Sequence, residues 1–391
     1  MSLVGTWMQR ASQAWLVLEM TESPFLLGLI GVMQFLPVLL LSLIAGAVAD
    51  RVPKQKLILA MQVGLGLQAF IMSGLVFAGI IEYWHIVVLA LLQGVGTAFD
   101  TPTRQSFIVE MVGKDDLMNA ISLNSAIFNG ARIIGPAIGG LVMHHFGAGT
   151  AFLLNGISYL FVVYALLKIK VPVSSTPPKH KNLVAEVREG LHFVYHTPAV
   201  FETLSLVGLL GIFALNMSIL VPVLARDVLG QSAAGYGLLM SAMGVGAVFG
   251  AATLAWFAHR GPRRQVLFGG ATALTITQLI ISRTNDYTLS LFLLFALGWG
   301  LITYTATANS SLQVASPDSL RGRVMSIHSL LNGGTSPIGN LFAGTVTEIW
   351  GAAGGFLACG GVGLLCTVGL LWRGRGKNKR LGITPSVSEC S

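Results

Sequence analysis

The sequence predicts an all-α, polytopic membrane protein whose twelve transmembrane helices form two pseudo-symmetric bundles of six. Three observations lead to this prediction: a composition suited to lipid, twelve apolar stretches of spanning length, and weak internal repetition. Of the 391 residues, 53% are hydrophobic and only 10% are charged, whereas soluble domains carry about 25% charged residues. The 47 glycines fit helices that pack closely inside a bilayer.

Twelve apolar stretches are long enough to cross a bilayer, since a spanning helix needs about 20 mostly apolar residues. They are expected over residues 1–20, 25–49, 57–80, 84–104, 118–142, 149–167, 199–224, 235–258, 265–282, 287–312, 324–346 and 351–372. The first begins almost at the initiator Met and carries the polar residues Gln9, Arg10 and Gln13 near its start. We therefore expect a first helix that is truncated at its N-terminus, without the charged leader and cleavage site of a signal peptide.

The basic residues gather on one side of the predicted bundles. Loops that follow the even-numbered stretches, together with the C-terminal tail, hold twenty of the 24 Lys and Arg residues. Because cytoplasmic loops carry the excess of Lys and Arg, both termini are expected in the cytoplasm and the protein in the plasma membrane, the inner membrane of a bacterium. These loops also account for the net charge of +8, so no nucleic-acid partner is expected.

The longest polar connection divides the twelve stretches six and six. It is first rich in Pro, Ser and Lys, and then places apolar residues at helical spacing at Leu183, Val187, Leu191 and Val194. The expected parts are an N-terminal six-helix bundle (1–167), a cytoplasmic linker with an amphipathic helix (168–198), a C-terminal six-helix bundle (199–372) and a basic cytoplasmic tail (373–391).

The two halves repeat each other weakly. Identical residues stand 209 positions apart at Ser23 and Ser232, Gly28 and Gly237, and Leu29 and Leu238. Others stand 203 positions apart at Asp115 and Asp318, and at Asn129 and Asn332. Parallel repeats of six helices are expected of one common class of transporter, in which the halves rock about a site near the middle of the membrane.

Sequence motifs narrow this class. The loop "GAVADRVPKQK" resembles the G-x-x-x-D-R-x-G-R-K loop of the major facilitator superfamily at Gly46, Asp50 and Arg51, with Pro53 in place of the usual Gly and Lys54 in place of the usual Arg. The resemblance implies a conformational latch at these positions, made in one conformation and broken in the other. The alternative is a solvated turn that only sets topology.

The fifth stretch contains "GPAIGG", which resembles the G-P-x-x-G-G antiporter motif that is typical of exporters in this superfamily. The matching residues are Gly135, Pro136, Gly139 and Gly140. Pro removes a backbone donor and Gly removes a side chain, so this helix is expected to bend and lie tightly against a neighbour. The alternative is plain helix packing without a part in the direction of transport.

The resemblance extends over essentially the whole chain. "AFDTPTRQSFIVEMV", "ARDVLGQSAAGYGLL" and "LRGRVMSI" are similar to the branch that contains the enterobactin exporter and macrolide-efflux proteins. In the fourth stretch, "QGVGTA" is similar to a family motif, but Ala90 stands where that motif carries an Arg linked to proton transfer.

Arginines inside the membrane mark the expected cavity, because a buried charge there is costly and usually faces a cavity or a partner. Polar residues share faces of the first and fifth helices, and a polar run in the tenth stretch is expected to face them. The candidate cavity residues are Arg10, Gln13, Asn124, Phe128, Arg132, Tyr304 and Asn309. The alternative for each arginine is a structural ion pair or a position near the membrane surface.

Few carboxylates are placed to couple transport to protons. Asp100 and Arg104 lie one helical turn apart near the inner end of the fourth stretch, and Glu19 lies at the outer end of the first. We expect Asp100 and Arg104 to form an exchangeable pair, or else a structural one.

Other activities lack their sequence signatures. No G-x-x-x-x-G-K-[ST] phosphate loop is present, the eight His residues are scattered, and Cys359, Cys366 and Cys390 are too few for a Cys-type metal site. The expectation is a non-enzymatic, cofactor-free and metal-free monomer. We expect this monomer to be a secondary exporter of drugs, macrolides, siderophores or metabolites, in exchange for protons or another ion. The alternatives are an importer, symporter or facilitator on the same fold, and a membrane sensor or membrane-embedded enzyme.

Overall fold

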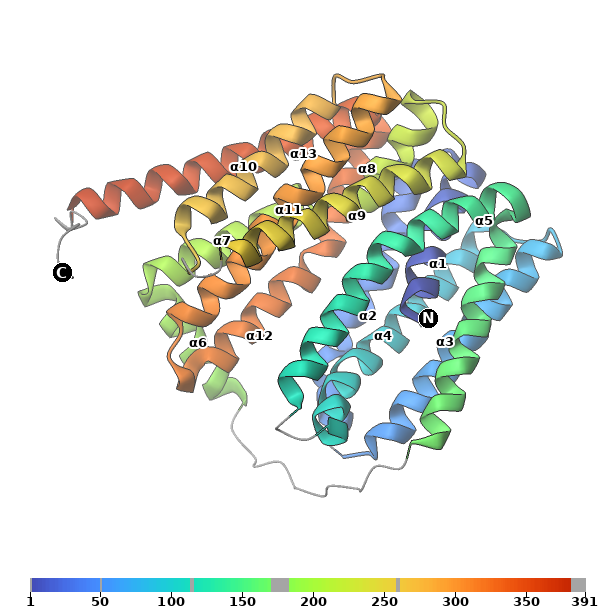
Figure 1. The fold of residues 1–391 in the computed structure, drawn as a ribbon, viewed down its shortest axis with the longest axis horizontal. Coiled ribbons are helices and arrows are strands. Elements are labelled where there is room, and N and C mark those ends of the chain that lie inside the picture. Colours follow the sequence, from blue (N-terminus) through green and yellow to red (C-terminus); the bar gives the residue numbers. More distant parts are fainter. Residues whose placement is uncertain (1, 50, 113–115, 170–182, 258–260, 381–391) are drawn as a thin grey trace.

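The computed structural model describes residues 2–49, 51–112, 116–169, 183–257 and 261–380, and this part of the chain is helical without a β-strand. The helices gather in two bundles, one from each half of the chain (Figure 1). The N-terminal bundle contains α1 (Ser2–Thr21), α2 (Pro24–Ala49), α3 (Lys54–Phe77), α4 (Tyr83–Val112) and α5 (Leu117–Lys168).

The second half begins with the short α6 (Leu183–His196), which follows the part of the predicted linker outside the described residues. The C-terminal bundle contains α7 (Pro198–Phe213), α8 (Met217–Val223), the π-helical turn η1 (Leu224–Val228), α9 (Ala233–Trp256), α10 (Arg264–Ile281), α11 (Tyr287–Ala315), α12 (Asp318–Gly334) and α13 (Ser336–Arg380). The last helix runs past the predicted end of the twelfth stretch, so the tail begins as helix.

Two of these long helices each contain two membrane-spanning arms. α5 reverses at Gly147 (φ 80°) and α13 at Gly351 (φ 68°), both in the left-handed region that favours glycine. The two glycines stand 204 positions apart, which is nearly the offset of the sequence repeats. The hairpins therefore occupy equivalent places in the two halves.

The described helices supply the twelve predicted spans. Eight stretches are long and apolar enough to cross a membrane by length and composition alone, and two of them, Gly130–Lys168 and Leu320–Arg373, cover both arms of a hairpin. The other two spans are α1 and the 18-residue α10. The polar residues near the start of α1 lower its mean hydropathy. The fold predicted from the sequence is confirmed, and the chain is an integral membrane protein.

Two spans predicted as single helices are broken. The stretch 199–224 divides at Asn216, whose side-chain amide donates to the carbonyl of Ile212 at 2.8 Å and so competes with the helix. The stretch 324–346 divides at Thr335, because Pro337 has no N–H to continue the hydrogen-bond ladder. The predicted continuity of both helices was therefore wrong.

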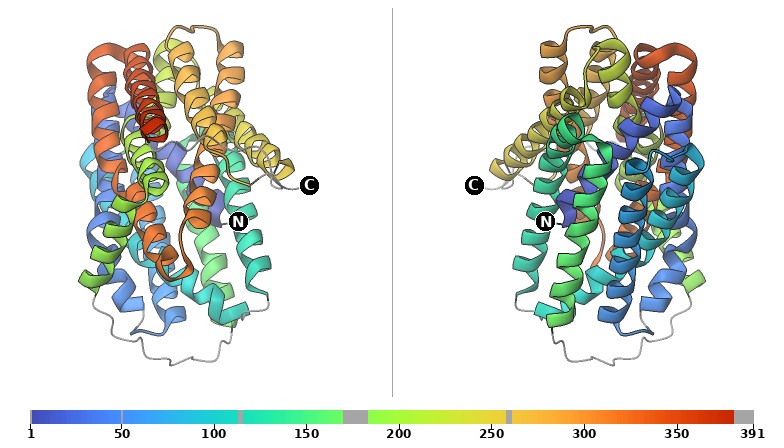
Figure 2. Two further views of the ribbon diagram at one scale, coloured as in Figure 1. Left: turned by 90° about the vertical axis from the view of Figure 1, so that its left-hand side faces the viewer. Right: turned by 90° about the vertical axis from the view of Figure 1, so that its right-hand side faces the viewer.

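The helices of each bundle pack against one another, and fewer pairs of helices join the two bundles. In the N-terminal bundle α1 and α3 contact α5, and α2 contacts α4; in the C-terminal bundle α11 contacts α9 and α10, and α13 contacts α7 and α10. The bundles meet chiefly along α5 with α9 and along α2 with α13. The three views show that these helices run beside one another (Figures 1 and 2).

One of the two main contacts between the bundles is the crossing of α5 and α9, and it is formed by glycines. A Cβ added to Gly140 would lie 2.5 Å from the carbonyl oxygen of Ala233 and 2.8 Å from the Cα of Gly237. A Cβ added to Gly237 would lie 2.7 Å from the carbonyl oxygen of Pro136. Only the absence of side chains lets the two backbones approach so closely.

The crossing of α2 and α13 repeats this arrangement. A Cβ added to Gly28 would lie 2.6 Å from the carbonyl oxygen of Asn340, and one added to Gly344 would lie 2.9 Å from that of Pro24. Pro24 and Gly28 precede Ala233 and Gly237 by 209 positions, whereas Asn340 and Gly344 follow Pro136 and Gly140 by 204. The same contact is thus made twice, with the halves exchanged.

A carboxylate strengthens the second crossing alone. Glu348 of α13 accepts hydrogen bonds from the Ser23 hydroxyl at 2.7 Å and from the backbone N–H of Phe25 at 3.0 Å, at the start of α2. A carboxylate at a helix N-terminus is stabilised by the exposed N–H groups and the helix dipole. Both crossings lie near the starts of α2 and α9, and we refer to this end of the molecule as the closed end.

A methyl group at the α5–α9 crossing should separate the bundles. Gly140→Ala is expected to destabilise the described arrangement by about 1–3 kcal/mol, because the new Cβ meets backbone atoms that have no rotamer to change. The thermal unfolding midpoint of the purified protein in detergent measures this loss. Gly130→Ala is the matched control on the same helix, since nothing lies within 4 Å of its added Cβ. Equal midpoints for the two variants would show that this crossing is not tight.

Candidate functional site

A cavity of about 440 Å³ lies between the two bundles. The N-terminal bundle contributes residues of α1, α2 and α5 to its wall, and the C-terminal bundle contributes residues of α7–α13. Its size falls within the range of sites for drug-sized ligands. We refer to it as the central cavity.

Two predicted arginines line the central cavity. Arg10 of α1 and Arg132 of α5 are the charged side chains among its described lining residues. The Arg10 guanidinium lies 5.2 Å from the ring centroid of Trp7, a cation–π distance. Arg10 Nε and Arg132 Nη2 are buried without a hydrogen-bond partner among the described residues. The described part of the chain pairs neither guanidinium with a carboxylate.

Glutamines continue the polar wall beside the arginines. Gln13, predicted for the cavity, accepts a hydrogen bond at 3.2 Å from Gln34 of α2, which also donates to Gln93 of α4 at 3.3 Å. The sequence analysis missed Gln34 and the C-terminal residues Asn216 and Asn340, all of which line the cavity. Their signal in the sequence is an amide side chain inside an otherwise apolar stretch, which a search for charged residues overlooks.

Two residues predicted for the cavity lie outside it. The side chains of Asn124 and Phe128 are exposed and do not line the central cavity. Residues four apart on an α-helix are rotated by about 40°, so Asn124 points about 80° away from Arg132. Phe128 instead contacts the ring of Trp7 edge-on at 5.8 Å.

Tyr304 and Asn309 lie in a neighbouring pocket of about 260 Å³. This pocket shares Thr305 and Asn332 with the wall of the central cavity, and His328 also lines it. The polar run of the tenth span therefore borders the central cavity through Thr305, whereas Tyr304 is almost fully buried within the C-terminal bundle.

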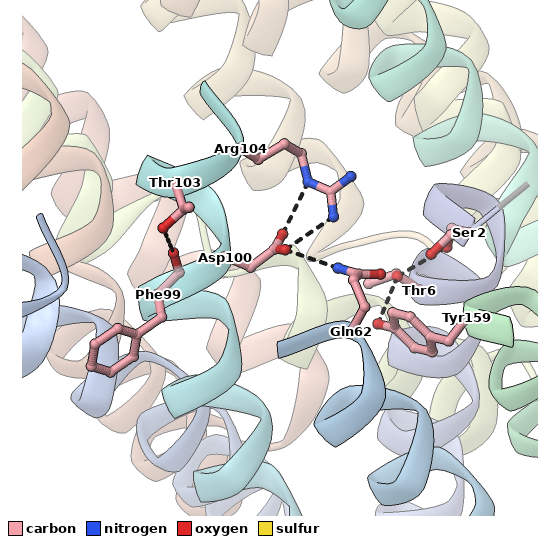
Figure 3. A network of polar contacts seen from close by, with 8 residues as sticks. All are labelled: Ser2, Thr6, Gln62, Phe99, Asp100, Thr103, Arg104 and Tyr159. Atoms are coloured by element: carbon pink, nitrogen blue, oxygen red, sulfur yellow. Dashed lines mark hydrogen bonds and ion pairs between the residues drawn. The ribbon is translucent and has the colours of Figure 1, made fainter. Parts of the chain in front are cut away.

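Asp100 and Arg104 form the pair predicted on α4. Arg104 donates from Nε and Nη2 to the two carboxylate oxygens of Asp100, each at 3.0 Å, and Gln62 of α3 donates to Asp100 at 2.9 Å (Figure 3). The Asp100 side chain is 14% exposed and that of Arg104 is 40% exposed. The carboxylate is therefore largely enclosed while its partner reaches toward solvent.

Tyr159, on the second arm of α5, contacts α1. Its phenol is within hydrogen-bond distance of the Thr6 hydroxyl, at 3.3 Å (Figure 3). Glu19, the other predicted coupling residue, is exposed at the end of α1 and lines neither cavity.

Of the residues in the predicted latch, Lys54 forms an ion pair that joins α3 to α4. Lys54, the first residue of α3, pairs with Glu110 near the end of α4, and the two side chains are 18% and 24% exposed. Asp50 lies outside the described residues, Arg51 is exposed in a turn, and nothing lies within 4 Å of a Cβ added to Gly46. Sequence spacing gave no sign of Glu110, because the pair joins residues 56 positions apart.

The Gly-Pro motif of α5 faces two neighbours. Added Cβ atoms at Gly135 and Gly139 would lie 2.5 Å and 3.2 Å from side-chain atoms of α1, whereas Gly140 contacts α9. Pro136 lines the central cavity. The motif thus lies where the cavity wall meets the crossing of the bundles. Among the described residues, no group of three or more His, Cys, Asp and Glu side chains is arranged to hold a metal ion.

Known proteins resemble this chain in sequence and in fold. The chain is 27% identical to the multidrug efflux pump Tap of Mycolicibacterium fortuitum, over 88% of this chain and 86% of the pump. It is 28% identical to the staphyloferrin A transporter of Staphylococcus aureus, over 63% of this chain and 62% of that protein. The crystal structure of the nucleoside transporter NupG superposes with a TM-score of 0.75, at 10% identity, over 95% of this chain and 97% of that one.

The family profile extends this similarity to nearly the whole chain. It is described as that of a transmembrane secretion effector, and it matches residues 1–379. This range includes both bundles, both glycine crossings and the central cavity. The chain therefore belongs to the transmembrane secretion effector family of the major facilitator superfamily of transporters.

Proposed function

We propose that this protein is a secondary exporter that moves drug-like, macrolide, siderophore or metabolite molecules out of the cell by alternating access. The observation that supports this most directly is the central cavity, which lies between two repeated bundles and is bounded by equivalent glycine crossings at the closed end. Relatives named as an efflux pump and a siderophore transporter agree with an exporting role.

The orientation follows from the basic residues. In our proposal, both termini, the 168–198 linker and the 373–391 tail lie in the cytoplasm, and the protein is a monomer in the plasma membrane of a bacterium. The bundles 1–167 and 199–372 then move as the two halves. Lys54 and Arg51 lie at the opposite end of α2 from Pro24, so the closed end faces outward. The described conformation is then the one that takes up substrate from the cytoplasm.

The Asp100–Arg104 pair is the proposed coupling site. A proton on Asp100 removes the charge that holds Arg104, and the bidentate hydrogen bonds lose their charge assistance. The hydrogen bond from Gln62 links Asp100 to α3, which packs against α5 of the cavity wall. Export would then alternate with entry of a proton. Glu19 is the less favoured site, because its exposed side chain has no described partner to release.

A transport assay tests direction and coupling together. Inverted membrane vesicles containing the protein should accumulate a membrane-impermeant fluorescent dye without a basic group when the vesicle interior is made acid. Asp100→Asn should abolish the gradient-driven part, because an amide cannot exchange a proton, while Asp116→Asn on an exposed position should not. Accumulation that is unchanged in Asp100→Asn would remove the coupling role and leave the exporter. Probe accumulation only in right-side-out vesicles would instead indicate an importer.

The Lys54–Glu110 pair provides a separate prediction about the loop. Lys54→Glu or Glu110→Lys places like charges together between α3 and α4, and a partly exposed pair of this kind contributes up to about 1 kcal/mol, or about fivefold in a conformational equilibrium. Each single variant should transport more slowly by about that factor, and the double variant should recover. Equal amounts of protein in the membrane are checked by immunoblot. A double variant that transports no faster than the single variants would contradict a functional pair.

A further inference from the structure

The two arginines of the central cavity make one side of it positively charged. Arg10 and Arg132 supply the charge of the described lining, and no described Asp or Glu lies on that wall. Each guanidinium keeps a buried N–H without a partner. A cation inside a membrane protein normally faces a counter-charge, and here the counter-charge is missing from the described chain.

The fold itself does not require charge at these positions. The offset of 209 that relates α2 to α9 places Ile219 at the position equivalent to Arg10. The offset of 204 that relates the crossing residues of α5 and α13 places Ser336 at the position equivalent to Arg132. Both of these residues also line the central cavity, from the C-terminal bundle. Equivalent places in the same fold are therefore filled by an apolar and a neutral side chain in one half and by two cations in the other.

The facing wall carries no described charge and combines neutral polar side chains such as Asn216 and Asn340 with adaptable apolar ones. Met217 of α8 and Met240 and Met243 of α9 line the cavity from the C-terminal bundle, together with Leu215 and Leu301. Methionine side chains are flexible and polarisable, and they adapt to irregular apolar ligands. The cavity thus has a cationic wall from α1 and α5 and, from the other half, a neutral wall with a methionine-rich apolar part.

The geometry points to an amphipathic organic anion as the substrate of the central cavity, with its anionic group between Arg10 and Arg132 and its apolar body against the methionines. This inference rests on the proposed transport function and names its substrate class. Guanidinium groups bind carboxylates, sulfonates and phosphates through paired hydrogen bonds. Organic cations of the same size meet two like charges without a described carboxylate to offset them, so the cavity selects against them.

Equilibrium binding tests the inference without requiring transport. The purified protein in phosphatidylcholine nanodiscs is titrated with three dansyl probes of one chain length: 11-(dansylamino)undecanoic acid, its primary amide, and the corresponding alkylamine. Dansyl fluorescence excited through tryptophan reports binding close to the seven tryptophans of the protein, one of which, Trp7, lines the cavity. The acid should bind more tightly than the amide by about ten- to hundredfold, the range expected for a charged hydrogen bond, and the amine should bind most weakly.

Variants assign this preference to the arginines. Arg10→Gln and Arg132→Gln should each weaken binding of the acid by about tenfold or more and leave binding of the amide unchanged, which also shows that the variant is folded. Arg10→Lys and Arg132→Lys should recover part of the affinity, since the charge returns without the paired donors. Arg283→Gln is the matched control, because it removes a cation from an exposed position outside the cavity.

The result that overturns the inference is equal binding of the three probes, tighter binding of the amine, or acid binding that both Gln variants retain. If phosphatidylglycerol displaces the acid when the lipid is less concentrated than the acid, the bound anion is a membrane lipid. That result would also overturn the inference. Failure of the protein to transport any of the three probes, with selective acid binding intact, would count against export alone.

Discussion

The two halves of this protein meet along two close backbone contacts, and both depend on glycine. At each crossing a carbonyl oxygen occupies the space that a Cβ would need, at Gly140 and Gly237 in one crossing and at Gly28 and Gly344 in the other. In lipid there is no hydrophobic effect to press helices together, so close approach and dispersion must hold them. The same contacts also fix where the central cavity ends.

Much of the fold followed from the sequence because the bilayer restricts the choices. Backbone groups in lipid must be satisfied within a helix, so apolar length alone predicted the spans, and the glycine motif of α5 predicted a close neighbour. The breaks at Asn216 and Thr335 did not follow, since each depends on a local hydrogen bond or on a proline near an apolar run. Hydropathy is insensitive to both.

The candidate site was predicted less completely, for geometric reasons. Arg10, Gln13 and Arg132 stood out because charge and amide groups are rare in spans, and all three line the cavity. Asn124 and Phe128 precede Arg132 at intervals of four residues, which suggested one face of the helix. Each interval rotates the side chain by about 40°, so the two residues point away from the cavity. The partner of Lys54 depends on how α3 packs against α4. Such a pair follows from tertiary packing, which spacing in one chain does not reveal.

The repeats make differences between the halves informative. A duplicated fold offers each place twice, so a side chain present in only one copy is not demanded by the architecture. Arg10 and Arg132 are of this kind, with Ile219 and Ser336 as their counterparts. The scaffold of the cavity is thus symmetric while its chemistry is not.

The bond between Glu348 and the start of α2 makes the two crossings mechanically unequal. The residue at the equivalent place in the other half is His144, 204 positions earlier, which makes no hydrogen bond among the described residues. The α5–α9 crossing has a hydrogen bond of another kind, in which the Ser241 hydroxyl of α9 donates to the carbonyl of Ile133 at 3.2 Å. The α2–α13 crossing instead has a bonded carboxylate at the closed end. Separation of the halves at the closed end must therefore break the hydrogen bonds of a carboxylate at one crossing and a hydroxyl–carbonyl bond at the other. The two crossings thus differ in the polar contacts that oppose their opening.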